Sequence, residues 1–225
     1  MIAQAQMEKE KAVFAHVRRT LEQQGGEYAQ CDWFPFRKRS DHIFRVFRWT
    51  ERLREPDAVL DDAVMRIAAL VHDVGYAAED TGMPHAHRSA ALCRKFLPSF
   101  GYDDAFVAHV AHLVHHHSDK HLLKEPGTPL ELVLLMEADL LDESGAMSVV
   151  WDCLMEGAKP EQTFALAYRH IAEKTAAHLA EDIVVTPQAK RFWEEKRQLV
   201  TQFLAHLESD LAFDAPWQPE TVAVE

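Results

Sequence analysis

The sequence predicts an all-α fold. Apolar residues recur at spacings of three and four along nearly the whole chain, which is the period of an amphipathic helix. We find no run of alternating apolar and polar residues bounded by hairpin turns, the pattern that would indicate a strand. The chain has 225 residues, 48% of them hydrophobic, which is enough for one domain with a sizeable core. We therefore expect a single compact helical bundle over residues 1–225.

Glycine residues mark the ends of two expected helices. The first helix, over about 5–24, precedes Gly25 and Gly26, and the third helix stops near Asp73 because Gly75 follows. Capping, proline and apolar patterns place the others at about 40–54, 86–97, 103–117, 129–142, 145–157, 160–180 and 187–208, with the third starting after Pro56 and Asp57. The chemistry-bearing core would cover about 36–157, the C-terminal helices about 160–208, and a frayed tail the residues from Asp214 on.

Charge and composition limit the partners of the protein. A formal net charge of -12 argues against attraction of the whole surface to nucleic acid or anionic lipid. The first residues, MIAQAQMEKEKA, lack the apolar segment of a secretory signal, and no stretch of 18 apolar residues could span a bilayer. Cys31, Cys93 and Cys153 are too few and too far apart for a disulfide framework, so we expect reduced thiols. These features favour a cytoplasmic protein and leave a homodimer open.

Histidine is unusually frequent, at 14 of 225 residues. His42, the pair His72-Asp73, and Asp139 all lie in apolar helical context. Imidazoles and carboxylates together are ligands for a divalent metal such as Mn, Fe, Co, Ni or Zn, with Mg also compatible. Neighbouring helical residues point about 100° apart. His72 and Asp73 therefore reach one ion most easily where their helix ends, and Gly75 supplies that end.

The surroundings of the two aspartates also favour a cation. Asp73 lies in AALVHDV and Asp139 in LVLLMEADLL. Removing water from a carboxylate costs several kcal/mol unless the group is paired or binds a metal. The alternative is that His72 and Asp73 finish a helix through local hydrogen bonds and that Asp139 pairs with an arginine.

The segments around these residues are HIFRV at His42, AALVHDVGY at the His72-Asp73 pair and EADLLDESGA at Asp139, with HAHRSA from His85 and VAHLVHHHS between them. In this order they resemble the HD-domain superfamily of metal-dependent phosphohydrolases, over about residues 36–157. The resemblance implies a compact helical bundle in which His42, His72, Asp73 and Asp139 bind one metal. It is specific for the superfamily and carries no information on a particular substrate.

Some branches of the superfamily hold a second ion through additional histidines. The matching candidates are His85, with His87 as the alternative, and His116, with His117 as the alternative. His116 shares a helical face with two other histidines, whereas His117 is one step off that face. We favour His85 and His116 as ligands. A solvated polar face is the alternative for this histidine-rich helix.

Two basic residues are candidates for contact with an anionic substrate. Arg45 lies three residues after His42 on the same helical face and could hold a phosphate oxygen. Lys120, three residues after His117, could do the same from a loop. The alternatives are that Arg45 pairs with a carboxylate such as Asp41 and that Lys120 is solvated.

These residues together predict a hydrolase that uses one or two divalent cations to attack a phosphate ester or anhydride. The cation would acidify a bound water, and Arg45 or Lys120 would balance charge on the phosphoryl group. Asp142, three residues after Asp139, would orient a ligand histidine or act as general base. Its alternative role is to cap the helix that follows. The resemblance alone implies a nucleotide or another small phosphorylated metabolite as substrate.

One departure from the family pattern weakens the transfer of a substrate. Some nucleotide-hydrolysing relatives carry a further His-Asp pair just upstream of the first ligand, where this chain has Lys38 and Arg39.

Two other functions stay open. His85 and His116 could complete a two-iron site, as in the HD-type di-iron oxygenases, or the chain could be a non-catalytic module that senses a ligand.

Overall fold

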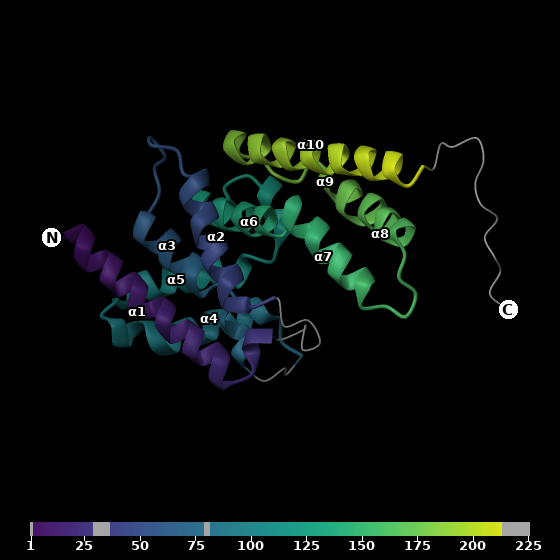
Figure 1. The fold of residues 1–225 in the computed structure, drawn as a ribbon. Coiled ribbons are helices and arrows are strands. Elements are labelled where there is room, and N and C mark those ends of the chain that lie inside the picture. Colours follow the sequence, from purple (N-terminus) through teal and green to yellow (C-terminus); the bar gives the residue numbers. More distant parts are fainter. Residues whose placement is uncertain (1, 29–36, 79–81, 213–225) are drawn as a thin grey trace. The chain divides into compact units, whose positions relative to one another are not determined.

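The predicted all-α class is confirmed. The computed structural model describes residues 2–28, 37–78 and 82–212, and these residues form helices and no strand (Figure 1). The α-helices are α1 (Ile2–Gln23), α2 (Arg39–Leu53), α3 (Asp62–Val71), α4 (His85–Phe96), α5 (Asp104–His116), α6 (Leu130–Asp142), α7 (Ala146–Gly157), α8 (Phe164–His170), α9 (Ala177–Leu179) and α10 (Pro187–Asp210). Short 3-10 helices are η1 (Gly26–Tyr28), η2 (Val74–Ala77), η3 (Leu97–Phe100) and η4 (Lys120–Lys124), and η5 (Ile171–Ala176) is π-helical.

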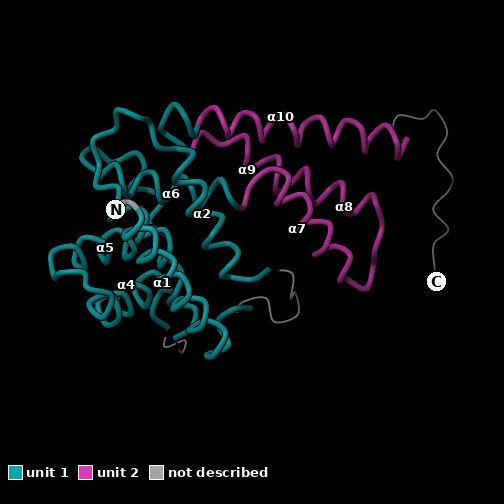
Figure 2. The backbone as a smooth tube through the Cα atoms, turned by 60° about the vertical axis from the view of Figure 1, so that its left-hand side comes forward, with its two compact units in different colours: residues 1–142, 184–189 teal, residues 143–183, 190–225 magenta. Residues whose placement is uncertain are grey.

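The backbone packs as two compact units, and the single domain expected over residues 1–225 stays a prediction (Figure 2). Unit 1 comprises residues 1–142 and 184–189, and unit 2 comprises residues 143–183 and 190–225. Helices α1 to α6 belong to unit 1, and α7 to α9 belong to unit 2. All candidate site residues are therefore in unit 1.

The core of unit 1 is built from helices that are distant in sequence. Helix α2 packs against α3 and α6, α3 packs against α5, and α4 packs against α5 and η2. Buried apolar side chains line these contacts, including Ile43 on α2, Ile67 on α3, Leu113 on α5 and Leu135 on α6. Burying each such side chain stabilises the fold by about 1.5–3 kcal/mol. This packing brings the end of α3 close to the first turn of α2, and the end of α5 close to the start of α4.

Helix α3 ends at the His72-Asp73 pair. The Asp61 side chain caps its start by accepting a hydrogen bond from the Val64 backbone N–H at 3.0 Å, so the helix begins later than the expected position after Asp57. His72 is the C-cap with helical backbone angles, whereas Asp73 leaves the helix with φ -108° and ψ 9°. Both side chains can therefore face the same region, as the sequence predicted.

Gly75 allows η2 to lie directly on α4. A Cβ atom at this position would lie 2.5 Å from the Ser89 backbone nitrogen and would overlap the His85 carbonyl oxygen. The Gly75 N–H donates a hydrogen bond to Ser89 Oγ at 2.8 Å. This close approach places the start of α4, and with it His85, beside Asp73.

The helix expected over about 160–180 begins later, at Phe164, and continues through η5 and α9 to Leu179. The Thr163 side chain accepts from the Leu166 N–H and starts α8, which passes into the π-helical turn η5 after His170. Helix α7 packs against α8 and η5, where Asp152 accepts a hydrogen bond from Thr175 Oγ1 at 2.6 Å.

Two other expectations concern thiols and membrane segments. Cys93 and Cys153 are free, and Cys31 lies outside the described residues, as does the tail expected from Asp214. Among the residues that the structure describes, no helix has the length and apolar character that a bilayer span requires.

Candidate metal centre

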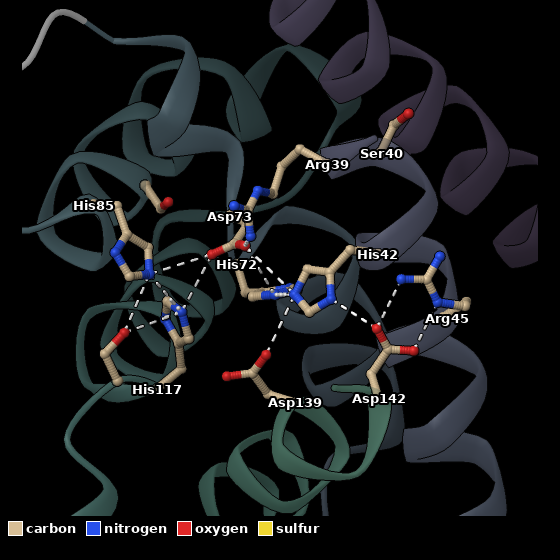
Figure 3. A network of polar contacts seen from close by, with 12 residues as sticks. Arg39, Ser40, His42, Arg45, His72, Asp73, His85, His117, Asp139 and Asp142 are labelled. Atoms are coloured by element: carbon tan, nitrogen blue, oxygen red, sulfur yellow. Dashed lines mark hydrogen bonds and ion pairs between the residues drawn. The ribbon is translucent and has the colours of Figure 1, made fainter. Parts of the chain in front are cut away.

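Imidazole and carboxylate side chains from five helical segments converge in unit 1 (Figure 3). Helices α2, α4 and α6 contribute residues from within the helix, and α3 and α5 contribute the residues that directly follow their last turns. The side chains are His42 from α2, His72 and Asp73 at the end of α3, His85 from α4, His117 at the end of α5, and Asp139 from α6.

The four ligands that the family resemblance implied lie together. His42 Nε2 is 3.3 Å from His72 Nε2, 3.3 Å from Asp139 Oδ1 and 3.5 Å from Asp73 Oδ2. Ligand atoms of His42, His72 and Asp139 all lie within 4.8 Å of one another, as a shared metal ion requires. His42 and His72 are buried, and the Asp139 side chain is 21% exposed, so Asp139 is the member of this trio that solvent reaches.

Asp73 connects this inner group to an outer one. His85 Nε2 lies 3.3 Å from Asp73 Oδ1, and His117 Nε2 lies 3.5 Å from the same oxygen. The two imidazole nitrogens are 3.3 Å apart. Because Asp73 Oδ2 faces His42 and His72, the carboxylate lies between two pairs of histidines.

The structure does not bring His116 to this cluster. His116 points elsewhere, with Nδ1 2.9 Å from Asp119 Oδ2, and lines a surface hollow with His112. Helix α5 ends at His116, and the following C-cap residue, His117, is 1% exposed and faces Asp73. The alternative that we ranked second at this position is therefore the one that the structure places in the cluster. His87, the fallback for His85, stacks on His115 with ring centroids 3.8 Å apart.

Three of the imidazoles are held by hydrogen bonds at Nδ1. His72 Nδ1 donates to the Ala69 carbonyl at 2.8 Å, and His117 Nδ1 donates to the Val114 carbonyl at 2.7 Å. His42 Nδ1 donates to Asp142 at 2.8 Å. Because a carbonyl or an ionised carboxylate can only accept, the proton of each ring is at Nδ1 when the ring is neutral, and Nε2 then presents a lone pair to the cluster.

The protonation of the histidines follows from their surroundings. Burial lowers the pKa of His72 to about 4, and the charge of Asp73 offsets this effect only in part. His72 is therefore neutral at pH 7 and able to bind a metal. Burial also opposes protonation of His42, but its hydrogen bonds to Asp139 and Asp142 outweigh burial and raise its pKa in the cation-free protein.

Both carboxylates of the cluster are ionised at neutral pH. Burial raises the pKa of Asp73, but the neighbouring His72 ring and the Arg39 guanidinium outweigh it and hold the pKa well below the ordinary value. Burial acts in the same direction on Asp139, whose pKa is held well below normal chiefly by Lys120 and His42. Ionised oxygens thus lie 3.3–3.7 Å from the Nε2 atoms of His42 and His72. Ionised carboxylates and neutral imidazoles are a donor set that fits a divalent cation, which would displace the proton that His42 shares with Asp139.

Arg39 is a site residue that the sequence analysis did not select. It is 4% exposed, and its Nη1 donates to Asp73 Oδ2 at 2.9 Å. Arg39 lies three residues before His42 on α2, which is the same spacing that selected Arg45 on the other side. This equal spacing on the two sides of His42 could have identified Arg39 from the sequence.

Lys120, which was expected in a loop, is the first residue of η4 and lies at the edge of the cluster. Its ammonium donates to Asp139 Oδ2 at 2.7 Å and to the Met136 carbonyl at 3.3 Å. The side chain is 32% exposed, so Lys120 connects the buried ligands to solvent. Asp139 consequently uses one oxygen toward His42 and the other toward Lys120.

Asp142 and Arg45 lie behind His42. Arg45 donates to both carboxylate oxygens of Asp142, from Nε at 2.8 Å and from Nη2 at 3.0 Å. Asp142 is 2% exposed, and although burial raises its pKa, the hydrogen bonds from His42 and Arg45 lower it overall. Arg45 therefore pairs with Asp142 rather than with Asp41, the carboxylate named in our alternative.

Comparison with known proteins supports the resemblance that the sequence motifs indicated. Residues 39–144 match the family model described as the HD domain. A curated relative is the uncharacterized protein YpgQ of Bacillus subtilis, which is 28% identical over 177 residues, covering 76% of this chain and 82% of YpgQ.

Solved structures show the same helical fold. The crystal structure of YpgQ in complex with ADP matches with a TM-score of 0.64 and 22% identity, covering 94% of this chain and 100% of that one. An HD-superfamily hydrolase from Bacillus thuringiensis matches with a TM-score of 0.65 and 22% identity, covering 92% and 99%. A predicted HD superfamily hydrolase from an uncultured Thermotogales bacterium matches with a TM-score of 0.62 and 22% identity, covering 90% and 92%.

Proposed function

We propose that this protein is a metal-dependent phosphohydrolase that acts on a nucleotide or another small phosphorylated metabolite. The observation that carries the proposal is the convergence of imidazole Nε2 lone pairs and two ionised carboxylates in one buried cluster. The ADP complex of the relative YpgQ supports the nucleotide class. The match of residues 39–144 to the HD domain model, together with the HD-superfamily hydrolases among the solved structures of the same fold, supports hydrolysis.

Two cations would share the cluster through Asp73. The inner cation would be held by His42, His72, Asp139 and Asp73 Oδ2. The outer cation would be held by Asp73 Oδ1 with His85 and His117, so His117 takes the place that we had assigned to His116. The number of imidazoles favours Mn, Fe, Co, Ni or Zn over Mg, which prefers oxygen ligands.

The charges around the ligands suit an anionic substrate. Asp73 and Asp139 carry two negative charges, and Arg39 and Lys120, which pair with them, carry two positive ones. The imidazoles are neutral when they bind a metal. Any bound dication therefore makes the centre positive, although the whole chain has a formal net charge of -12. Such a centre attracts a small phosphate, whereas the acidic surface disfavours a long polyanion.

We assign the chemistry of the site as follows. A divalent cation, when bound, supplies Lewis-acid charge and lowers the pKa of a water molecule. Asp142 is a positioning residue, because it is buried and both of its oxygens accept hydrogen bonds from side chains of α2, His42 and Arg45. Lys120 is the better candidate for contact with a phosphoryl oxygen, since it is partly exposed and has an N–H left to donate.

A metal-supplemented screen of nucleotides and small phosphoesters tests this function. We expect the wild-type protein to release phosphate with at least one divalent metal and Asp73→Ala to lose both metal binding and activity. Asp57→Ala, which changes an exposed acid away from the cluster, is the control and should behave like the wild type. Undiminished activity in Asp73→Ala would refute the site.

Metal analysis after aerobic purification separates the hydrolase from the di-iron oxygenase. Mn, Mg, Co or Ni in the protein favours hydrolysis, whereas two redox-active irons favour the oxygenase. Absence of turnover across the whole panel with every metal would favour a ligand-sensing module.

A further inference from the structure

His85 is held in the cluster differently from the other three histidines. The rings of His42, His72 and His117 are each fixed by a hydrogen bond at Nδ1. In the part of the chain that the structure describes, Nδ1 of His85 has no such partner. Its ring lies instead against the ring of Tyr76, with centroids 4.6 Å apart and an angle of 19° between the planes. Stacking therefore takes the place of the missing hydrogen bond.

Tyr76 is itself held by a residue of the cluster. The guanidinium carbon of Arg39 lies over the Tyr76 ring, 4.0 Å from its centroid. The same guanidinium donates to Asp73 Oδ2, while His85 Nε2 lies 3.3 Å from Asp73 Oδ1. Arg39 and His85 thus reach one carboxylate from two different helices, as Figure 3 shows, and Tyr76 connects them. The four residues form a closed ring of contacts.

The position of Tyr76 follows from the local sequence. It lies in η2, three residues after Asp73 and directly after Gly75, whose missing side chain lets η2 contact the start of α4. His85 is the first residue of α4, and its side chain is 26% exposed. A ring at a helix start, partly open to solvent, can turn about its side-chain bonds unless a neighbour prevents it.

We propose that Tyr76, with Arg39 over its ring, is the positioning residue that sets His85 as a ligand of the outer cation. The proposal rests on the two-cation ligand set described under the proposed function. It implies that the ligands of the two ions are held in place in different ways. The outer cation depends on a stacked ring, whereas the inner cation is bound by imidazoles whose Nδ1 atoms are hydrogen-bonded to backbone or carboxylate.

Titration of the full-length, cation-free protein with Mn²⁺ or Co²⁺ in a calorimeter tests this difference. Tyr76→Leu removes the flat ring, and we expect the affinity for the outer cation to fall by about tenfold. This is the lower end of the range for loss of a group that orients a metal ligand. The inner cation should keep its affinity. Tyr76→Phe keeps the ring and should leave both affinities unchanged. Equal affinities of wild type and Tyr76→Leu for the outer cation would overturn the proposal.

A second measurement does not depend on metal binding. Diethyl pyrocarbonate modifies exposed imidazoles, and tandem mass spectrometry reports its rate at His85 in the presence of a chelator. We expect His85 to react several-fold faster in Tyr76→Leu than in wild type or Tyr76→Phe. Tyr102→Leu is the matched control, because it removes a ring that stacks on Phe106 at 4.3 Å away from the cluster, and it should leave the rate at His85 unchanged.

The two measurements separate this proposal from the proposed function. A wild-type protein that binds no divalent cation contradicts the proposed function, while the rate at His85 still decides whether Tyr76 positions the ring. An unchanged rate in Tyr76→Leu overturns the positioning role even when two cations bind. A wild-type protein that binds a single cation, with an affinity that Tyr76→Leu does not alter, also overturns it.

Discussion

Asp142 Oδ2 accepts a hydrogen bond from His42 Nδ1 at 2.8 Å, although the two residues are 100 positions apart in the sequence. The contact joins α2 to the last residue of α6, and Arg45 holds the carboxylate from its other side. It fixes the tautomer of His42, so the ring directs its Nε2 lone pair toward His72 and Asp139. The arrangement resembles the carboxylate–histidine pairs that orient metal ligands in other proteins.

Replacing Asp142 with Asn should therefore weaken binding of the inner cation. The amide keeps the size of the side chain but can donate to His42 Nδ1, which favours the wrong tautomer. We expect metal affinity to fall by about 10- to 100-fold, measured by calorimetry with Mn²⁺ or Co²⁺. Arg54→Met, which breaks an exposed ion pair with Asp62, is a control that should leave the affinity unchanged. Wild-type affinity in Asp142→Asn would contradict the positioning role.

Stability of the cation-free protein should depend on pH through His72. Its pKa of about 4 in the folded state lies below the ordinary value of 6.5, so between these values the unfolded chain holds a proton that the folded protein lacks. The free energy of unfolding should therefore fall as pH drops from about 6.5 to about 4, by on the order of 3 kcal/mol in total. Since the pKa of His42 is raised, its contribution is present below pH 6.5 and is lost only at higher pH.

Urea denaturation at several pH values, in the presence of a chelator, measures this dependence. His72→Met cannot titrate and should show a smaller decrease between pH 6.5 and 4 than the wild-type protein. The same pH slope in both proteins would show that His72 is not the group responsible.

Lys120→Met should weaken the interaction with an anionic substrate more than that with the metal. Removing the ammonium leaves Asp139 as a ligand and takes away a positive charge at the exposed edge of the cluster. We expect kcat/KM to fall by about 10- to 100-fold, in line with about 1.5–3 kcal/mol for a hydrogen bond to a charged group. Lys120→Arg should retain part of the activity. Lys124→Met, at the far end of η4, is the control, and an equal loss in that variant would argue against a specific contact.

Gly75→Ala should destabilise unit 1. The new methyl group would meet the backbone of Ser89 and the His85 carbonyl, so η2 and α4 must separate. Overpacking of this kind costs about 1–3 kcal/mol, which thermal denaturation detects. Gly157→Ala is the matched control, because nothing lies within 4 Å of a Cβ atom there. A stability loss of the same size at both positions would contradict the close approach at Gly75.

The parts of the site that the sequence predicted are those that depend on local structure. The period of the apolar residues determined the helices, and the glycine after the His72-Asp73 pair determined where α3 ends. His42 and Asp139 followed from their apolar context, because a buried carboxylate or imidazole needs a partner of definite chemistry. The structure brings these four groups together.

Local sequence patterns could not decide which of two similarly placed residues belongs to the site. His116 and His117 differ by one step of about 100° around the helix axis, and only the packing of α5 against α3 and α4 decides that His117 faces Asp73. Arg39 and Arg45 lie three residues on either side of His42, so periodicity treats them alike. Contacts with Asp73 and Asp142 give them their different positions.

The sequence by itself thus determined the helical class, the ends of helices and the kind of chemistry that the site holds. Only the tertiary structure decided which histidine joins the cluster, which arginine touches a predicted ligand, and that the chain forms two compact units. The physical reason is the distance along the chain over which each effect acts. Helix period, caps and burial act over a few residues, whereas the direction in which a side chain meets a distant partner is set by how whole helices pack.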